Sequence, residues 1–156
     1  MPYQWELTTP FVTRAGVAFT IMKTALISLD ADFLNYNTAR LGSDDYNFKD
    51  ENQAIAKHYR NAFNIRAGGE YRLGPFQFRA GYSFFGNPYA SGEPNHNAKN
   101  RAISFGFGLR DKNMSVDFAW SHHMVNEKYF AYGIESSRID LKGTSNQIIA
   151  TLGFRF

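Results

Sequence analysis

Two aspartates, Asp30 and Asp32, stand two positions apart in a segment of alternating polar and apolar residues. Side chains two positions apart lie on the same face of a β-strand, and two neighbouring carboxylates can perform acid–base catalysis or bind a hard cation. Arg14 and Arg66 occupy polar positions of two other such segments. We therefore expect both carboxylates to form ion pairs with these arginines, in preference to catalysis or cation binding.

Charged residues recur on the polar side of most alternating segments. Arginine recognises carboxylates through two parallel hydrogen bonds, so a row of arginines could guide an anionic head group. The acidic residues on the same side offer a simpler role for the arginines, structural ion pairing, and we favour it. The candidate residues of this polar side are Arg14, Asp30, Asp32, Arg66, Glu70, Arg72, Arg79, Arg110 and Asp117, together with Arg155.

The histidines do not have the spacing of a metal site. His122 and His123 are adjacent, so on a strand they point to opposite faces, while His58 and His96 fall in polar connecting segments. The sequence contains no nucleophilic triad, phosphate-binding loop or nucleotide-binding fingerprint, and it has no cysteine. We therefore predict that the protein is not an enzyme and uses no cofactor or metal.

Seven segments must position these side chains, and each alternates between apolar and polar residues with a period of two. This period is typical of a β-strand, whereas it would place apolar residues all around a helix. The expected strands are Thr13–Met22, Ala25–Asn35, Phe63–Leu73, Phe76–Phe84, Ala102–Arg110, Met114–His123 and Gln147–Phe156. One short helix is expected in a loop, with Asp50 as its N-cap and Gln53 completing a capping box.

The connections between these strands alternate in length. The expected tight turns are Met22–Thr24, Leu73–Pro75 and Arg110–Asn113, and the expected long loops are Asn37–Asn61, Gly86–Asn100 and Val125–Ser145. Outer-membrane barrels have short periplasmic turns and long outer loops, and about ten residues of tilted strand cross the bilayer. The pattern therefore predicts an all-β fold, the antiparallel wall of a transmembrane β-barrel. An aromatic girdle is expected at its periplasmic end, from Tyr71, Phe76, Phe154 and Phe156.

The composition fits a membrane barrel. Aromatic residues make up 17% of the chain and charged residues only 20%, below the roughly 25% that is usual in soluble domains. The net charge of +3 is scattered without a basic run, so we expect no nucleic-acid partner. No apolar stretch is as long as a transmembrane helix, which leaves strands as the expected membrane-crossing elements.

The expected number of strands is odd. If the terminal strand descends to the periplasm, the first strand descends as well, whereas bacterial single-chain barrels have an even number of strands. Tyr3–Thr9 could add an eighth strand, or extend the first strand with a bend at Pro10. No signal peptide precedes the first strand, although an outer-membrane protein must be exported. We therefore expect residues 1–156 to be the C-terminal portion of a larger barrel, because an open sheet edge in lipid leaves backbone groups unsatisfied.

Alternation alone leaves the direction of the apolar face open. A soluble barrel that carries a lipid has the same period with its apolar residues inside. Three features favour lipid on the outside: glycine beside Arg and Asp on the polar side, rows of Phe, Tyr and Trp on the apolar side, and the alternating loop lengths. The candidate polar residues are therefore predicted to line the lumen.

Six motifs follow one another in the chain: WELTTPFVTRAGVAF, ALISLDADFLNY, NIRAGGEYRL, FQFRAGYSFFGNPY, ISFGFGLRD and the terminal TLGFRF. Their order resembles the C-terminal half of FadL-like outer-membrane transporters, most closely the Bacteroidetes branch. The resemblance implies a fourteen-stranded barrel in the outer membrane of a Gram-negative bacterium, surrounded by lipid, which passively passes hydrophobic compounds such as long-chain fatty acids. It also implies that the plug and the lateral opening belong to the other half, and that barrel-assembly machinery reads Phe156 as its signal.

Three functions remain as alternatives. The first is passive transport of hydrophobic compounds across the outer membrane, by a chain that forms seven or eight strands of a larger barrel. The second is a small complete eight-stranded outer-membrane barrel with a structural or adhesive role. The third is a soluble β-barrel lipid carrier. We favour the first.

Overall fold

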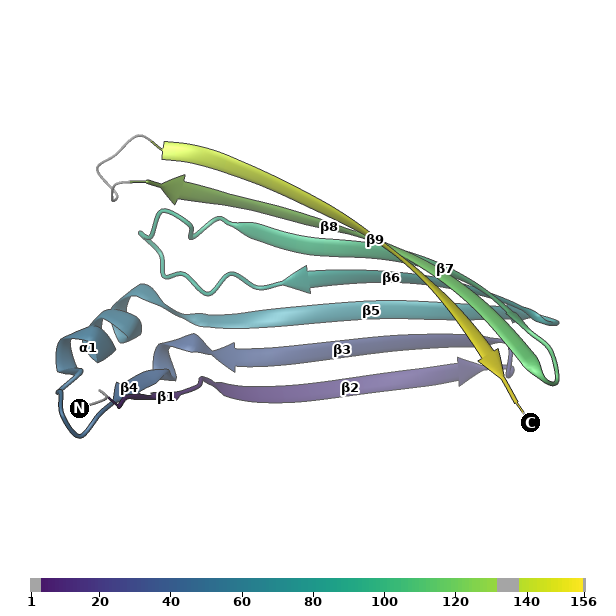
Figure 1. Cartoon of the computed structure of the whole chain (residues 1–156), viewed down its shortest axis with the longest axis horizontal. Coiled ribbons are helices and arrows are strands. Elements are labelled where there is room, and N and C mark those ends of the chain that lie inside the picture. Colours follow the sequence, from purple (N-terminus) through teal and green to yellow (C-terminus); the bar gives the residue numbers. More distant parts are fainter. Residues whose placement is uncertain (1–3, 132–137, 156) are drawn as a thin grey trace.

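The computed structural model describes residues 4–131 and 138–155, which form mainly antiparallel β-strands (Figure 1). One sheet holds seven strands in the order β2-β3-β5-β6-β7-β8-β9, so spatial order follows chain order. The strands are β2 Phe11–Ile21, β3 Ala25–Asn35, β5 Asn61–Leu73, β6 Phe76–Phe85, β7 Lys99–Arg110, β8 Met114–Phe130 and β9 Arg138–Phe154. The all-β prediction and the seven expected strands are confirmed.

The last hairpin is longer than the sequence pattern predicts. β8 and β9 pair without interruption over 17 residues each, from Met114 opposite Phe154 to Phe130 opposite Arg138. The predicted loop Val125–Ser145 is therefore wrong, because most of it is paired strand. The paired residues of this segment lack the contrast between an apolar and a polar face, and backbone pairing between β8 and β9 joins them.

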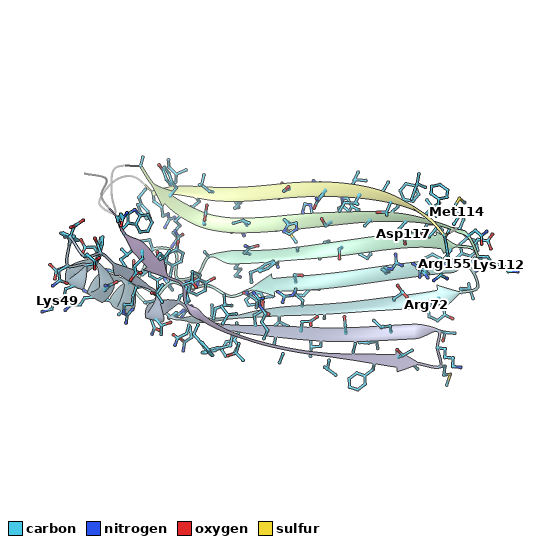
Figure 2. The ribbon with its side chains drawn as sticks, turned by 60° about the horizontal axis from the view of Figure 1, so that its bottom comes forward. Lys49, Arg72, Lys112, Met114, Asp117 and Arg155 are labelled. Atoms are coloured by element: carbon cyan, nitrogen blue, oxygen red, sulfur yellow. The ribbon has the colours of Figure 1, made fainter. Side chains whose placement is uncertain are left out.

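Tight turns and long connections lie at opposite ends of the sheet (Figure 1). The turn end holds the connections β2–β3, β5–β6 and β7–β8, which are the three predicted tight turns. The loop end holds the long connections and helix α1, Lys49–His58. Figure 2 shows Lys49 of α1 at the loop end, with Lys112 and Arg155 at the turn end.

The long connection between β3 and β5 contains small elements, one of which pairs with a short strand that precedes β2. The strand β1, Glu6–Thr8, pairs with β4, Arg40–Gly42, in a separate two-stranded sheet, so it is not an eighth strand of the main sheet. A 3-10 helix, η1 Tyr36–Thr38, precedes β4. Thus the described part of the predicted segment Tyr3–Thr9 leads through Pro10 into β2.

Helix α1 begins two residues earlier than the capping box predicts. Phe48 is the N-cap and makes no side-chain cap hydrogen bond, while Asp50 lies inside the first turn, so the predicted capping role of Asp50 is wrong. The helix is held instead by Asn52, whose side chain accepts a hydrogen bond from the Leu41 amide at 2.8 Å and donates one to the Leu41 carbonyl at 2.9 Å. A side chain that mimics strand pairing therefore attaches α1 to β4.

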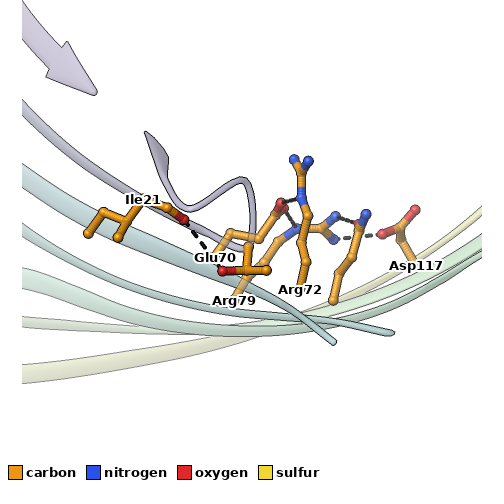
Figure 3. A network of polar contacts seen from close by, with 7 residues as sticks. Ile21, Glu70, Arg72, Arg79 and Asp117 are labelled. Carbon is orange, nitrogen blue, oxygen red and sulfur yellow. Dashed lines mark hydrogen bonds and ion pairs between the residues drawn. The ribbon is translucent and has the colours of Figure 1, made fainter. Parts of the chain in front are cut away.

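The main sheet is a single layer without a core. Among the described residues, the only buried apolar ones are the small Ala62 and Ala102, and no large side chain is fully buried. On the apolar face Phe19 is 63% exposed and Leu152 66% exposed. The sheet curves around its polar face, and a polar network lies on the inner side of the curve (Figure 3). We call the two sides the concave polar face and the convex apolar face.

Candidate functional site

The largest polar cluster of the concave face lies near the turn end and joins three strands (Figure 3). Glu70 on β5 accepts from Arg72 Nε at 2.5 Å and from Arg79 Nε at 2.7 Å. Arg79 on β6 also donates through Nη1 to Asp117 Oδ1 on β8 at 2.6 Å, and through Nη2 to Gln77 Oε1. We call these five residues the turn-end network. Its two arginines and two carboxylates balance in charge.

Glycines on β7 allow Arg79 to reach Asp117. Strand β7 runs between β6 and β8, and in the register Arg79 faces Gly106 while Asp117 faces Gly108. A Cβ atom at Gly108 would lie 2.5 Å from Asp117 Oδ1 and 3.3 Å from Arg79 Nη1. Real Cβ atoms do not approach polar atoms so closely, so the missing side chain is what leaves the path of the ion pair open.

A second cluster lies nearer the loop end and contains part of the predicted aspartate pair. Arg66 Nη2 bonds both carboxylate oxygens of Asp32, at 2.8 and 2.9 Å, and Arg14 Nε lies 3.7 Å from Asp32 Oδ1. Asp32 is buried, whereas Asp30 is exposed and makes no hydrogen bond or ion pair with a described residue. The predicted network therefore forms around Asp32, and Asp30 is not part of it.

The other candidate residues lie on the same face but outside both clusters. Arg110 and Arg155 line a polar hollow of about 260 Å³ beside the last turn, and neither side chain forms an ion pair with a described residue. A larger hollow of about 420 Å³ spans β3 to β9, and its floor includes Ser28, Gly68, Glu70 and Thr151. The concave face is thus a shallow, open surface with polar clusters.

The two adjacent histidines point to opposite faces of their strand, as the sequence predicts. His122 lies on the convex apolar face and His123 on the concave face, because they are consecutive on β8. His122 stacks on Trp120 with ring centroids 5.9 Å apart, and its Nδ1 lies 2.8 Å from Asn146 Oδ1. No group of three or more potential metal ligands occurs within residues 4–131 and 138–155.

The loop end is held together by polar contacts that the sequence did not predict. His58 Nδ1 of α1 lies 2.5 Å from Glu93 Oε1, and the Tyr59 and Tyr89 rings stack at 5.6 Å. Burial raises the pKa of Tyr89, with smaller contributions from Tyr59 and Glu127. The side chain of Asn95 accepts a hydrogen bond from the backbone N–H of Lys128 at 2.6 Å and donates one to the backbone carbonyl of Lys128 at 2.9 Å. These two bonds attach the loop to β8.

Three of the four residues predicted to form an aromatic girdle lie near the turn end of the sheet. Tyr71, Phe76 and Phe154 lie on the convex face and are 52%, 42% and 65% exposed. Phe156, the predicted assembly signal and the fourth member of the girdle, lies outside the described residues.

Comparison with known proteins adds no relative: no family model, curated protein or solved structure matches the chain. Within the described residues, neither helix is long and apolar enough to cross a membrane. The functional argument therefore rests on the faces of the sheet and on the clusters described above.

Proposed function

We propose that the sheet is part of the wall of a transmembrane β-barrel in the outer membrane of a Gram-negative bacterium, and that the barrel passes hydrophobic compounds passively. The observation that carries this proposal is the convex apolar face. A soluble domain of this length would bury such side chains in a core, and an exposed apolar surface of this extent marks contact with lipid or another apolar partner.

The apolar residues of the convex face form a band that runs obliquely across the sheet. On the main-sheet strands from β3 to β9 a run of apolar outward residues begins at the turn end. It stops before a polar or charged residue on every one of these strands except β6, where Gly86 follows beyond the end of the strand. The last residues of these runs are Phe33, Phe63, Phe84, Ile103, Trp120 and Ile148. Phe33 and Phe63 lie opposite each other in the register. On each of the next three strands the last apolar residue, first Phe84, then Ile103 and then Trp120, lies one outward-facing position closer to the turn end than on the strand before.

The slope of the band corresponds to tilted strands. From β3 to β9, the limit of the band on the side of the loop end moves toward the turn end by three outward-facing positions, about 20 Å along the strands. These two strands are separated by five strand spacings, about 24 Å in total. This is a slope of roughly 40°, and the limit on the side of the turn end, which moves by two such positions, gives roughly 30°. Strands of outer-membrane barrels are tilted by about 35–45°. An apolar belt that is level with the membrane would have this slope on the sheet.

The curvature argues against a soluble lipid carrier. Such a carrier encloses its ligand, so its apolar residues would point to the concave side. Here the concave side carries the turn-end network and the Asp32 cluster, and the convex side carries the aromatic residues. Long connections at one end and tight turns at the other add the asymmetry of outer-membrane barrels.

The direction of the edge strands argues against a complete eight-stranded barrel built from this chain alone. β2 and β9 are the two edges of an antiparallel sheet of seven, so they run in the same direction. β1 pairs with β4 and does not extend the sheet. Antiparallel closure therefore requires an odd number of further strands.

A feature at the loop end favours a hydrophobic cargo. Where β8 and β9 extend beyond the apolar band, their concave side becomes apolar: Tyr129, Ile139 and Leu141 are 53%, 47% and 41% exposed. Tyr129 and Ile139 are paired residues, and Leu141 faces Glu127 next to them. We assign this apolar ledge to solute entry. Long-chain fatty acids as the cargo follow from the resemblance to FadL-like transporters.

The test is uptake by the bacterium that produces the protein. Deleting its gene should lower uptake of a radiolabelled long-chain fatty acid and leave uptake of glucose unchanged. Complementation with Leu141→Asn should restore less uptake than complementation with Asp140→Asn, the adjacent outward-facing position. Unchanged fatty-acid uptake in the deletion strain would refute the transport proposal.

A further inference from the structure

The charged residues on the convex side of the seven strands gather in one place. They lie at the loop ends of β7, β8 and β9, and we call them the basic patch: Lys99, Arg101, Lys128, Arg138, Asp140 and Lys142. The register of these strands is continuous, so all six share the face of Phe105 and Trp120. Five cations and one acid give the basic patch a charge of +4.

The cations of the basic patch are close to each other and mostly unpaired. Lys99 and Lys142 flank Asn126 in the register, which places their backbones about 10 Å apart. Arg101 is the next outward residue after Lys99 on β7, about 7 Å away. Of the cations of the basic patch, only Arg138 forms an ion pair with a described residue, Asp140, at 3.2 Å. Lys99, Arg101 and Lys142 are exposed.

The basic patch lies directly beyond the apolar band, on the side of the loop end. Arg101 is the first outward residue beyond Ile103, the last apolar residue of the band on β7. On β8, Trp120 ends the apolar run and His122 follows it, stacked on the indole. Going toward the loop end, the surface therefore changes from apolar to amphipathic aromatic to cationic, which is the order of a membrane's acyl chains, interface and anionic head groups.

We propose that the basic patch binds the phosphorylated head group of a glycolipid in the outer leaflet, with the acyl chains lying along Ile103, Phe105 and Trp120. This inference rests on the proposed membrane location of the sheet. Cation clusters beside a membrane-spanning surface attract anionic lipid. A head group with several phosphates on a sugar scaffold matches the several cations of the basic patch better than the single charge of one phosphodiester does.

Two further features favour this occupant. A small hollow of about 190 Å³ lies at the basic patch between Asn97, Asn126, Lys128 and Lys142, and its amides suit the hydroxyl groups of a sugar. A second copy of the chain is disfavoured as occupant, because two patches of +4 repel each other. The convex faces of β2 to β6 carry no charged residue in their strands, so the site is confined to one side of the sheet.

The test measures lipid binding by the full chain in neutral detergent micelles. The probe is purified lipid A, a glycolipid with two phosphates, and the readout is Trp120 fluorescence in a Trp5→Phe background. We expect a saturable change with lipid A at low salt that weakens at high salt. Removing three charges with Lys99→Gln, Arg101→Gln and Lys142→Gln should weaken binding ~100-fold, since each basic residue contributes about fivefold in affinity.

Two controls isolate the basic patch. The variant Lys23→Gln with Lys112→Gln removes two cations from the turn end and should bind lipid A as the unmodified chain does. The variant Lys99→Arg with Lys142→Arg keeps the charges and should retain binding. Inorganic phosphate should compete only at far higher concentration, because it lacks the acyl chains.

Three outcomes would overturn the lipid site: equal affinity of the patch variant, equal loss in the turn-end variant, or unchanged binding of dephosphorylated lipid A, which would indicate glycan recognition. These outcomes differ from failure of the membrane proposal. If the chain remained monomeric and folded in buffer without detergent, the membrane location itself would be refuted.

Discussion

At the scale of single residues, the polar contacts of the concave face depend on glycines, which leave room for the neighbouring charged side chains. Arg79 connects Glu70 on β5 with Asp117 on β8 by crossing β7. The crossing is open because β7 presents Gly106 and Gly108 beneath the guanidinium. Partly exposed ion pairs contribute little energy individually. We infer that the network mainly fixes the positions of charges along the wall.

We predict that Gly108→Ala displaces the ion pair between Arg79 and Asp117, because the added methyl group would lie 2.5 Å from the carboxylate oxygen. The expected cost is about 1 kcal/mol of folding free energy, the value of one charged hydrogen bond at a partly exposed site. Urea titration of the chain in lipid vesicles measures it. Gly143→Ala is the control, because a Cβ there meets nothing closer than 3.9 Å. Equal effects of the two variants would contradict this explanation.

The assignment of faces leads to a second prediction at this scale. Phe105 is 56% exposed on the convex face, and Ser104, its neighbour in the chain, points to the concave face. Phe105→Arg should destabilise the inserted protein by about 2–4 kcal/mol, since a charge would face the membrane interior. Ser104→Arg should cost less. If a refolding titration in bilayers ranked the two in the opposite order, lipid would lie on the concave side.

At the scale of elements, the sequence predicted strands where the two faces differ in polarity. Strands β2, β3, β5, β6 and β7 separate apolar from polar residues, so their number, order and tight turns could be read directly, whereas the short strand β4 fell inside a predicted loop. The extension of β8 and β9 could not be read in this way, because Asn126 and Lys128 alternate with the mixed pair Glu127 and Tyr129. The period of two in a sequence comes from the different environments of the two faces of a strand. A paired strand whose faces do not differ in this way shows no such period.

The candidate site was predictable to a similar extent. The ion pair of Arg79 with Glu70 follows from strand register, which alternation and turn lengths determine. The contact of Arg79 with Asp117 does not, because it crosses β7. Gln77 was missed, since an uncharged amide gave no signal. Asp30 was wrongly assigned a partner because Arg66, which faces it in the register, bonds Asp32 diagonally instead.

The turn between β2 and β3 gives a prediction at the element scale. Met22 and Lys23 have φ angles of 48° and 60°, and Thr24 donates to the Ile21 carbonyl at 3.0 Å, which is a tight two-residue hairpin turn. Positive φ disfavours both side chains, whereas Asn-Gly adopts this turn readily. Met22→Asn with Lys23→Gly should stabilise the protein by about 1–2 kcal/mol.

The control for this turn is Gly74→Ala in the next one, where φ is 58°. That change should lower stability, because it puts a side chain into the same backbone region. Chemical unfolding in vesicles compares the three proteins. Equal stability of the Asn-Gly variant and the unmodified chain would show that the β2–β3 turn relaxes in the membrane.

At the scale of the whole molecule, the sheet has two unpaired edges that run in the same direction. Each edge presents free backbone donors and acceptors, which cost several kcal/mol apiece in hydrocarbon. The band of apolar residues reaches both edges, with Phe19 on β2 and Ile148 on β9. The proposed location in lipid would therefore require partners on both sides, and an odd number of additional strands would provide antiparallel pairing at each edge.

We predict that the chain of residues 1–156, refolded alone in detergent micelles, does not close on itself. Direct pairing of β2 with β9 would be parallel, and a seven-stranded ring would crowd the side chains of the turn-end network and the Asp32 cluster into one narrow lumen. Amide hydrogen exchange measured by mass spectrometry should therefore be fast in β2 and β9 and slow in β5 to β7. Edge-to-edge association should appear as concentration-dependent oligomers. The inner strands are the control, because they are paired on both sides whether or not the sheet closes. Strong and equal protection of β2 and β9 in a monomer would show that the chain forms a complete small barrel, and the proposal of a larger wall would then be wrong.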